Sequence, residues 1–257
     1  MRLYVDRSHE YWAKILWVAQ FQARFSFLRF KSRQTEVEVD GKKMQTAPLG
    51  LLRDLDPKRV MRAQVGGQDL VVWRASNGDV SAWDNRCPHR GMALSHGFVR
   101  GNDLACLYHG WHYGSTGACS YIPAHPDLDP PETIKTAAFS VAIADGVIWV
   151  STNGVAQPAP VPMASQPLRC FHVQARSDGL VHACRTVAFE GGAPKQIEPG
   201  LYRLGARRVF VLENPLDEDR IQVTALVDAD ATPNDCAALS RWCDAVRRLA
   251  QTEKVAA

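Results

Sequence analysis

Two short segments, each carrying one cysteine and one histidine, constrain this chain more than any other feature. The first reads Cys87-Pro88-His89, and the second, beginning after a further sixteen residues, reads Cys106-Leu107-Tyr108-His109. Thiolate and imidazole groups are the ligands that zinc and some iron–sulfur clusters take from proteins. The pattern therefore predicts one metal centre clamped from opposite sides by two loops.

Two kinds of metal centre fit these four ligands. Two cysteines and two histidines suit tetrahedral zinc, and they also suit a [2Fe–2S] cluster in which thiolates hold one iron and imidazoles the other. Gly91 and Gly110 follow the two pairs and permit tight turns that turn backbone N–H groups toward cluster sulfurs. Pro88 stiffens the first loop. These neighbours favour the cluster, and a colourless zinc-bound interaction module is the alternative.

The stretches CPHRG (residues 87–91) and LACLYHGWHY (residues 104–113) resemble the Rieske domain of Rieske non-haem iron oxygenases. The resemblance covers residues 50–152 and is much weaker outside them. It implies that Cys87 and Cys106 hold one iron of the cluster, and that His89 and His109 hold the other.

The respiratory-chain Rieske type is less similar, because it has a further cysteine in each loop and joins the two as a disulfide. Met92 and Tyr108 stand at the corresponding places in this chain. The resemblance thus implies a reduction potential near the low end of the Rieske range, about −150 mV.

Composition excludes several classes of protein. The net charge of +3 is too small to indicate a nucleic-acid partner, and no apolar run is long enough to span a membrane. The cysteines outside the two pairs show no paired spacing, so we expect reduced thiols in a cytoplasmic protein. Residues 8–30 predict an amphipathic helix that packs on its own domain or a neighbouring subunit rather than on a membrane.

The rest of the chain predicts a mainly β, α+β fold overall, in four parts. An N-terminal helical segment and connector (1–45) precedes an antiparallel β Rieske domain (46–152), a proline-rich linker (153–167) and a final domain (168–257). Strand patterns separated by Gly or Asn-Gly turns occupy residues 60–65, 69–74, 80–85, 136–144 and 147–151.

The final domain predicts two hairpins and one long helix. The hairpins pair 168–175 with 180–189 and 208–213 with 220–227, and the helix spans 235–254. This pattern is similar to a reduced form of the helix-grip catalytic domain of Rieske oxygenases.

The resemblance fails at the second iron site of the family. A complete oxygenase subunit holds a mononuclear iron with two histidines and a carboxylate, the ligands lying on a helix. Only His172 and His182 follow the linker, and both fall on predicted strands. We therefore expect no mononuclear Fe(II) on this chain and assign no catalytic residue. Alternatively, the two could face each other across the first hairpin and form a facial triad with Asp178 or Glu190.

The resemblance implies a Rieske electron-transfer subunit in an oligomeric oxygenase system. It would relay single electrons from a reductase or ferredoxin to a mononuclear iron site on a partner oxygenase subunit. The alternative is a self-sufficient mono- or dioxygenase, such as a hydroxylase or demethylase, with an unconventional iron site in residues 168–257. A third possibility is a scaffold subunit whose cluster only stabilises the fold. The sequence indicates no substrate.

Overall fold

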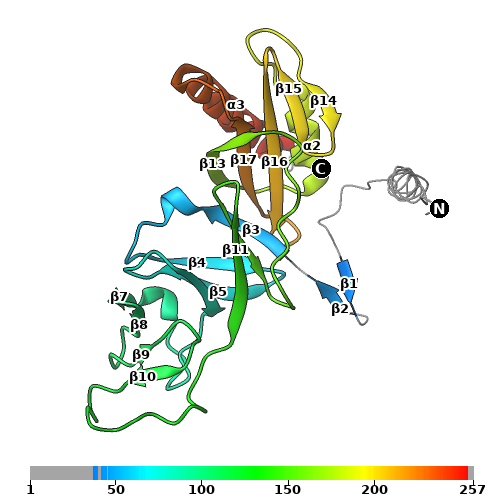
Figure 1. The fold of residues 1–257 in the computed structure, drawn as a ribbon. Helices are drawn as coiled ribbons and strands as arrows, with labels where there is room; N and C mark the ends of the chain where they lie inside the picture. Colours follow the sequence, from blue (N-terminus) through cyan, green and yellow to red (C-terminus); the bar gives the residue numbers. More distant parts are fainter. Residues whose placement is uncertain (1–36, 40–41, 45, 254–257) are drawn as a thin grey trace, which may run out of the picture. The chain divides into compact units, whose positions relative to one another are not determined.

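Antiparallel strands dominate the computed structural model of the protein, which describes residues 37–39, 42–44 and 46–253 (Figure 1). The expectation of a mainly β, α+β fold is confirmed. The helix predicted for residues 8–30 lies outside the described residues. No helix in the described part of the chain has the length and apolar character needed to cross a membrane.

A six-stranded antiparallel sheet forms the body of the cluster-loop region, which comprises residues 46–152. Its order is β3 (Thr46–Leu51), β12 (Val147–Ser151), β11 (Ala138–Ala144), β6 (Val80–Asp84), β5 (Gln68–Arg74) and β4 (Val60–Val65). The five strands predicted from turn signals are all present, with ends that differ by at most two residues. The connector predicted before them contains β1 (Val37–Val39) and β2 (Lys42–Met44), which pair with each other, and it ends where β3 begins.

A smaller four-stranded sheet carries the two cysteine–histidine segments. Its order is β10 (Cys119–Tyr121), β9 (His112–Tyr113), β8 (Asp103–Ala105) and β7 (Phe98–Arg100). Two 3-10 turns, η1 (Leu52–Asp54) and η2 (Leu94–His96), complete the region. Trp73 and Trp83 meet edge to face at 5.0 Å in the core beneath these strands, and the same core cluster includes Cys87, Cys106 and Tyr113. The ligand segments are thus anchored directly on a packed core.

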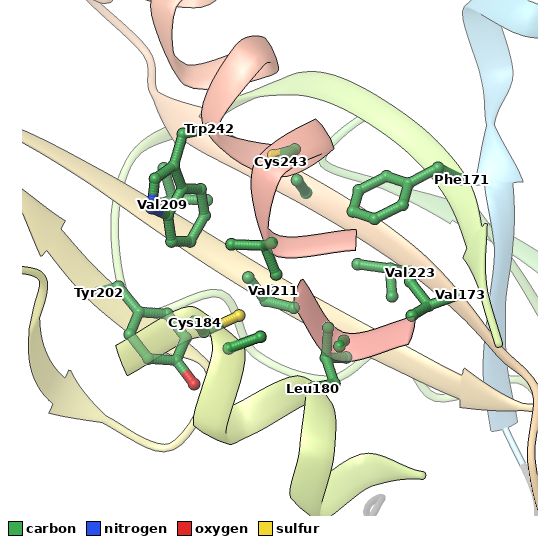
Figure 2. Close-up of a cluster of buried hydrophobic side chains, with 14 of the residues drawn as sticks. Phe171, Val173, Leu180, Cys184, Tyr202, Val209, Val211, Val223, Trp242 and Cys243 are labelled. Carbon is green, nitrogen blue, oxygen red and sulfur yellow. The ribbon is translucent and has the colours of Figure 1, made fainter. Parts of the chain in front are cut away.

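A five-stranded antiparallel sheet organises the C-terminal region, residues 165–253. Its order is β13 (Ser165–Val173), β17 (Ile221–Asp228), β16 (Arg207–Pro215), β15 (Leu201–Leu204) and β14 (Lys195–Glu198). The helices α2 (Ser177–Thr186) and α3 (Pro233–Glu253) pack on one face of it, where Trp242 and Leu180 meet Val209 and Val211 (Figure 2). The predicted long helix is present as α3.

The opposite face of this sheet packs on the cluster-loop region. Side chains alternate along a strand, so Phe210 and Leu212 of β16 point away from the helices and join a second core cluster with Leu51 and Trp149. The strand β17 lies between the two packed layers, and all eight of its residues are buried.

Polar side chains also join the two regions. The Gln222 amide donates to the backbone oxygen of Leu49 at 2.5 Å, and the Asn214 amide donates to that of Gln64 at 2.9 Å. The described residues accordingly belong to one compact unit of the fold.

The hairpin predicted around residues 177–179 is wrong, because the segment is the helix α2. Leu180, Ala183 and Cys184 are its buried residues, and their i, i+3, i+4 spacing places them on one helix face. The hairpin prediction took residues 177–179 as a turn between two strands and overlooked this period. The segment from β16 to β17 is a hairpin, as predicted.

Candidate iron–sulfur site

The first cluster loop connects β6 to η2 and is closed by its own backbone. The Cys87 N–H donates to the oxygen of Met92 at 2.8 Å, and the Gly91 N–H donates to the oxygen of Cys87 at 2.8 Å. The side chain of Asn85 fixes the base of the loop, because its oxygen accepts the Ser95 N–H at 2.7 Å. The loop is therefore ordered by bonds that leave the Cys87 and His89 side chains available.

The second cluster loop, between β8 and β9, repeats the same backbone pattern. The Cys106 N–H donates to the oxygen of Trp111 at 2.9 Å, and the Gly110 N–H donates to the oxygen of Cys106 at 3.0 Å. In both loops, then, a cysteine bonds to the residues four and five positions later. The backbone around the two cysteines therefore has the same hydrogen-bond pattern in both loops.

A glycine closes each loop for a conformational reason. Gly91 and Gly110 have φ angles of 73° and 68°, in the left-handed region that side chains rarely adopt. At Gly110 a Cβ atom would also lie 3.1 Å from the Pro123 ring. The glycines that the sequence places after each pair are thus required by the turns.

The two thiols lie inside the protein. Cys87 and Cys106 are 3% and 2% exposed, and burial raises the pKa of the Cys106 thiol. Backbone N–H groups of Tyr108 and His109 are directed at the Cys106 sulfur and act in the opposite sense on its pKa. The hydroxyl of Tyr113 lies 3.1 Å from the Cys87 sulfur. Polar groups thus lie against both sulfur atoms.

The two imidazoles lie on the outer side of the site and touch each other. Their ring centroids are 4.6 Å apart, with His89 half-buried and His109 exposed. Trp111 of the second loop stacks on His89 of the first at 4.1 Å and 6°. Partial burial, and then the charges of His109 and Arg90, lower the pKa of His89. The Trp111 stack therefore links the two loops through a predicted ligand.

This arrangement suits a centre with two metal ions. The two thiols are buried, whereas the imidazoles are half-buried (His89) and exposed (His109), so each iron of a cluster with mixed ligands could take ligands of one kind. Two thiols and two imidazoles are also the ligand set of a Rieske [2Fe–2S] cluster.

The structure separates the other two histidines of interest. His172 is exposed on β13, whereas His182 is on α2, where its Nε2 atom lies 3.2 Å from the Thr186 hydroxyl. The hairpin register that would have set them opposite each other does not exist. The sequence alone indicated no role for Trp111 or Tyr113, although both lie in the quoted stretch 104–113.

Comparison with known proteins identifies the same region. The family model described as Rieske [2Fe-2S] domain matches residues 45–138. This match supports a Rieske cluster as the cofactor of the chain.

Curated relatives match the same part of the chain. Oxidoreductase NdmD of Pseudomonas putida is 41% identical over 121 residues, which are 47% of this chain and 20% of that protein. The 4beta-methylsterol monooxygenase of Methylococcus capsulatus is 33% identical over 135 residues, 51% of this chain and 33% of that protein. The chain spans a third or less of the length of these two relatives.

The fold likeness extends further than the sequence likeness. NdmA of Pseudomonas putida CBB5 superposes with a TM-score of 0.62 over 80% of this chain and 79% of the NdmA chain, at 18% identity. Since the identity is low, this comparison concerns the fold alone. The superposition covers 80% of this chain, whereas the sequence matches to the two curated relatives cover 47% and 51%.

Proposed function

Because the chain belongs to the Rieske non-haem iron oxygenase family, we propose that it is an electron-transfer component of a Rieske-type oxygenase system. It would take single electrons from a reductase or ferredoxin and deliver them to a mononuclear iron on a partner subunit. The observation that carries this proposal is the sorting of two buried thiols and two outward imidazoles on matching loops.

In this proposal Cys87 and Cys106 hold the inner iron, and His89 and His109 hold the outer one. A bound Rieske cluster supplies reversible one-electron storage. The buried walls around both cysteines exclude water, and the Tyr113 hydroxyl, 3.1 Å from the Cys87 sulfur, would donate a hydrogen bond to the thiolate of a bound cluster. The exposed ring of His109 gives a partner protein direct access to the outer side of the site.

We assign the parts of the chain accordingly. Residues 46–152 are the Rieske domain, 153–167 the linker, and 168–257 a helix-grip-like domain that contacts partner subunits. The core of the last domain is filled by side chains from α2, α3 and the sheet, which supports a structural or docking role for it. The free thiols of the described cysteines are consistent with a cytoplasmic location.

Coulometric titration of the anaerobically purified protein tests this function. An electron-transfer component should take up one electron per chain, and a His109→Ala variant should take up none while it remains folded. A matched Cys236→Ser variant, altered on α3 away from both loops, should behave as wild type. Uptake of two electrons by wild type would indicate a second redox site on this chain and contradict the proposal.

A further inference from the structure

A basic hollow of about 300 Å³ opens beside the first cluster loop. Arg86, Arg90 and Lys135 line it, together with the ring of His89 and a single carboxylate, Asp84. All three cations are exposed, and none of the ion pairs found in the described part of the chain uses them. Positive charge is therefore concentrated at this edge of the site, although the net charge of the chain is only +3.

An apolar tip lies on the other cluster loop. Leu107 and Tyr108 are adjacent in the sequence and each is 56% exposed. The Tyr108 ring lies 3.8 Å from the ring of His109, which in turn lies 4.6 Å from His89 in the hollow. The apolar tip and the basic hollow thus meet at the two imidazoles.

We propose that these five side chains, Arg86, Arg90, Lys135, Leu107 and Tyr108, form a docking surface for an acidic electron-carrier protein. The proposal rests on the proposed electron-transfer function and specifies the chemistry of its donor. A protein interface commonly has an apolar centre and a polar rim, and complementary charges accelerate encounter. Carboxylates on the carrier would enter the hollow while an apolar patch covers the tip.

This arrangement would bring the carrier directly over the predicted nitrogen ligands. Steering by complementary charge raises association rates by about 10- to 1000-fold at low salt, and a salt concentration near 0.1 M screens exposed charges beyond about 10 Å. The rate of electron entry should consequently depend on salt and on these three cations.

The test is stopped-flow reduction of the cluster-loaded protein by an excess of reduced plant-type [2Fe–2S] ferredoxin, used as an acidic carrier. In 20 mM NaCl the variant Arg86→Glu/Arg90→Glu/Lys135→Glu should be reduced at least about tenfold more slowly than wild type. Raising NaCl to 200 mM should slow wild type about tenfold and the variant little. A Leu107→Ser variant should show a smaller loss that salt does not remove.

A matched control variant separates the effect of charge at the hollow from the effect of the net charge of the chain. Arg203→Glu/Arg241→Glu/Arg248→Glu changes the net charge equally at exposed positions on β15 and α3, and it should stay within about twofold of wild type. Equal slowing in both triple variants, or none in the first, would overturn the proposal. If the loop substitutions disturb cluster loading, Lys135→Glu alone, outside both loops, should still slow reduction about threefold.

Two further measurements distinguish a failure of the docking surface from a failure of the proposed electron-transfer function. Visible spectra and reduction by dithionite should be the same in wild type and variants; absence of a Rieske spectrum in wild type would instead contradict the proposed function. Sedimentation should give the same oligomeric state for wild type and the hollow variant. If the variant dissociates, the surface binds a second copy of this chain and the proposed carrier is wrong.

Discussion

Each region of the molecule buries a cysteine against a tyrosine, and the two pairs serve different ends. In the cluster-loop region the Tyr113 hydroxyl lies 3.1 Å from the Cys87 sulfur, with the imidazoles on the outer side of the same site. In the C-terminal region Cys184 of α2 and Tyr202 of β15 belong to one buried cluster (Figure 2). The two histidines of this region, His172 and His182, are both exposed.

The difference lies in the surrounding backbone. Cys87 is on a loop that closes through a left-handed glycine and leads to a half-buried histidine two residues later. Cys184 is in a helix, and burial raises the pKa of its thiol and that of the Tyr202 hydroxyl. The comparison shows that a nearby tyrosine does not by itself mark a cysteine as a metal ligand. The tight loop, with a histidine two residues after the cysteine, distinguishes Cys87 from Cys184.

Replacing the two cysteines should give the largest contrast. Cys87→Ser should abolish the visible cluster spectrum, because one thiolate ligand is lost. Cys184→Ser should keep the full spectrum and lower stability by about 1–3 kcal/mol, because it buries a new polar group. Iron content and absorbance of the two variants measure this, and a normal spectrum in Cys87→Ser would show that the ligand assignment is wrong.

Truncating Trp242 should affect the C-terminal region alone. This side chain is 4% exposed, and its ring nitrogen donates to the backbone oxygen of Val187 at 2.9 Å. Trp242→Ala should cost about 3–5 kcal/mol in the free energy of unfolding. Chemical denaturation measures the loss, with Trp242→Phe as the milder control. A shifted electron paramagnetic resonance signal in the folded variant would mean that the two regions are not independent.

Removing the hydroxyl of Tyr113 or of Tyr202 should have a smaller effect, and it should change the reduction potential only at Tyr113. A hydrogen bond to a cluster sulfur stabilises the reduced state, so Tyr113→Phe should lower the reduction potential by about 50 mV, the equivalent of about 1 kcal/mol for one electron. Tyr202→Phe should leave the potential unchanged. Redox titration followed by spectroscopy decides the matter, and equal potentials for Tyr113→Phe and wild type would show that the Tyr113 hydroxyl does not tune the cluster.

The smallest effect concerns Glu213 on β16, whose pKa is raised by burial. The folded protein then keeps a proton that the unfolded chain releases, so stability falls as pH rises from the unfolded pKa through the folded pKa. Glu213→Gln should flatten this slope and raise Tm by about 1–3 °C at pH 7. Thermal unfolding at several pH values measures it, and a steeper slope in the variant would mean that the folded protein binds the proton less tightly than the unfolded chain.

The sequence predicted the parts of the fold that depend on neighbours along the chain. The strands β4 and β12 match their predicted bounds, because turn residues mark where each begins or ends. The rings of His89 and His109 lie 4.6 Å apart and the thiols of Cys87 and Cys106 are both buried, and the assignment of these four residues as ligands stays a prediction.

The remaining features depend on contacts between distant residues. Tyr113 and Cys87 are 26 positions apart, and nothing local indicates that the hydroxyl reaches the sulfur. The strands β14 and β15 are four residues each and are defined by pairing within a sheet that the sequence does not specify. The error at α2 differs from these, because a helical period was present locally and residues 177–179 were taken as a turn instead.

Iron and acid-labile sulfide per chain, with electron paramagnetic resonance of the reduced form, test the central claim most directly. We predict two irons, two sulfides and a Rieske-type signal from anaerobically purified protein. A third iron whose signal changes with nitric oxide would contradict this claim, because the chain would then hold its own oxygen-activating site.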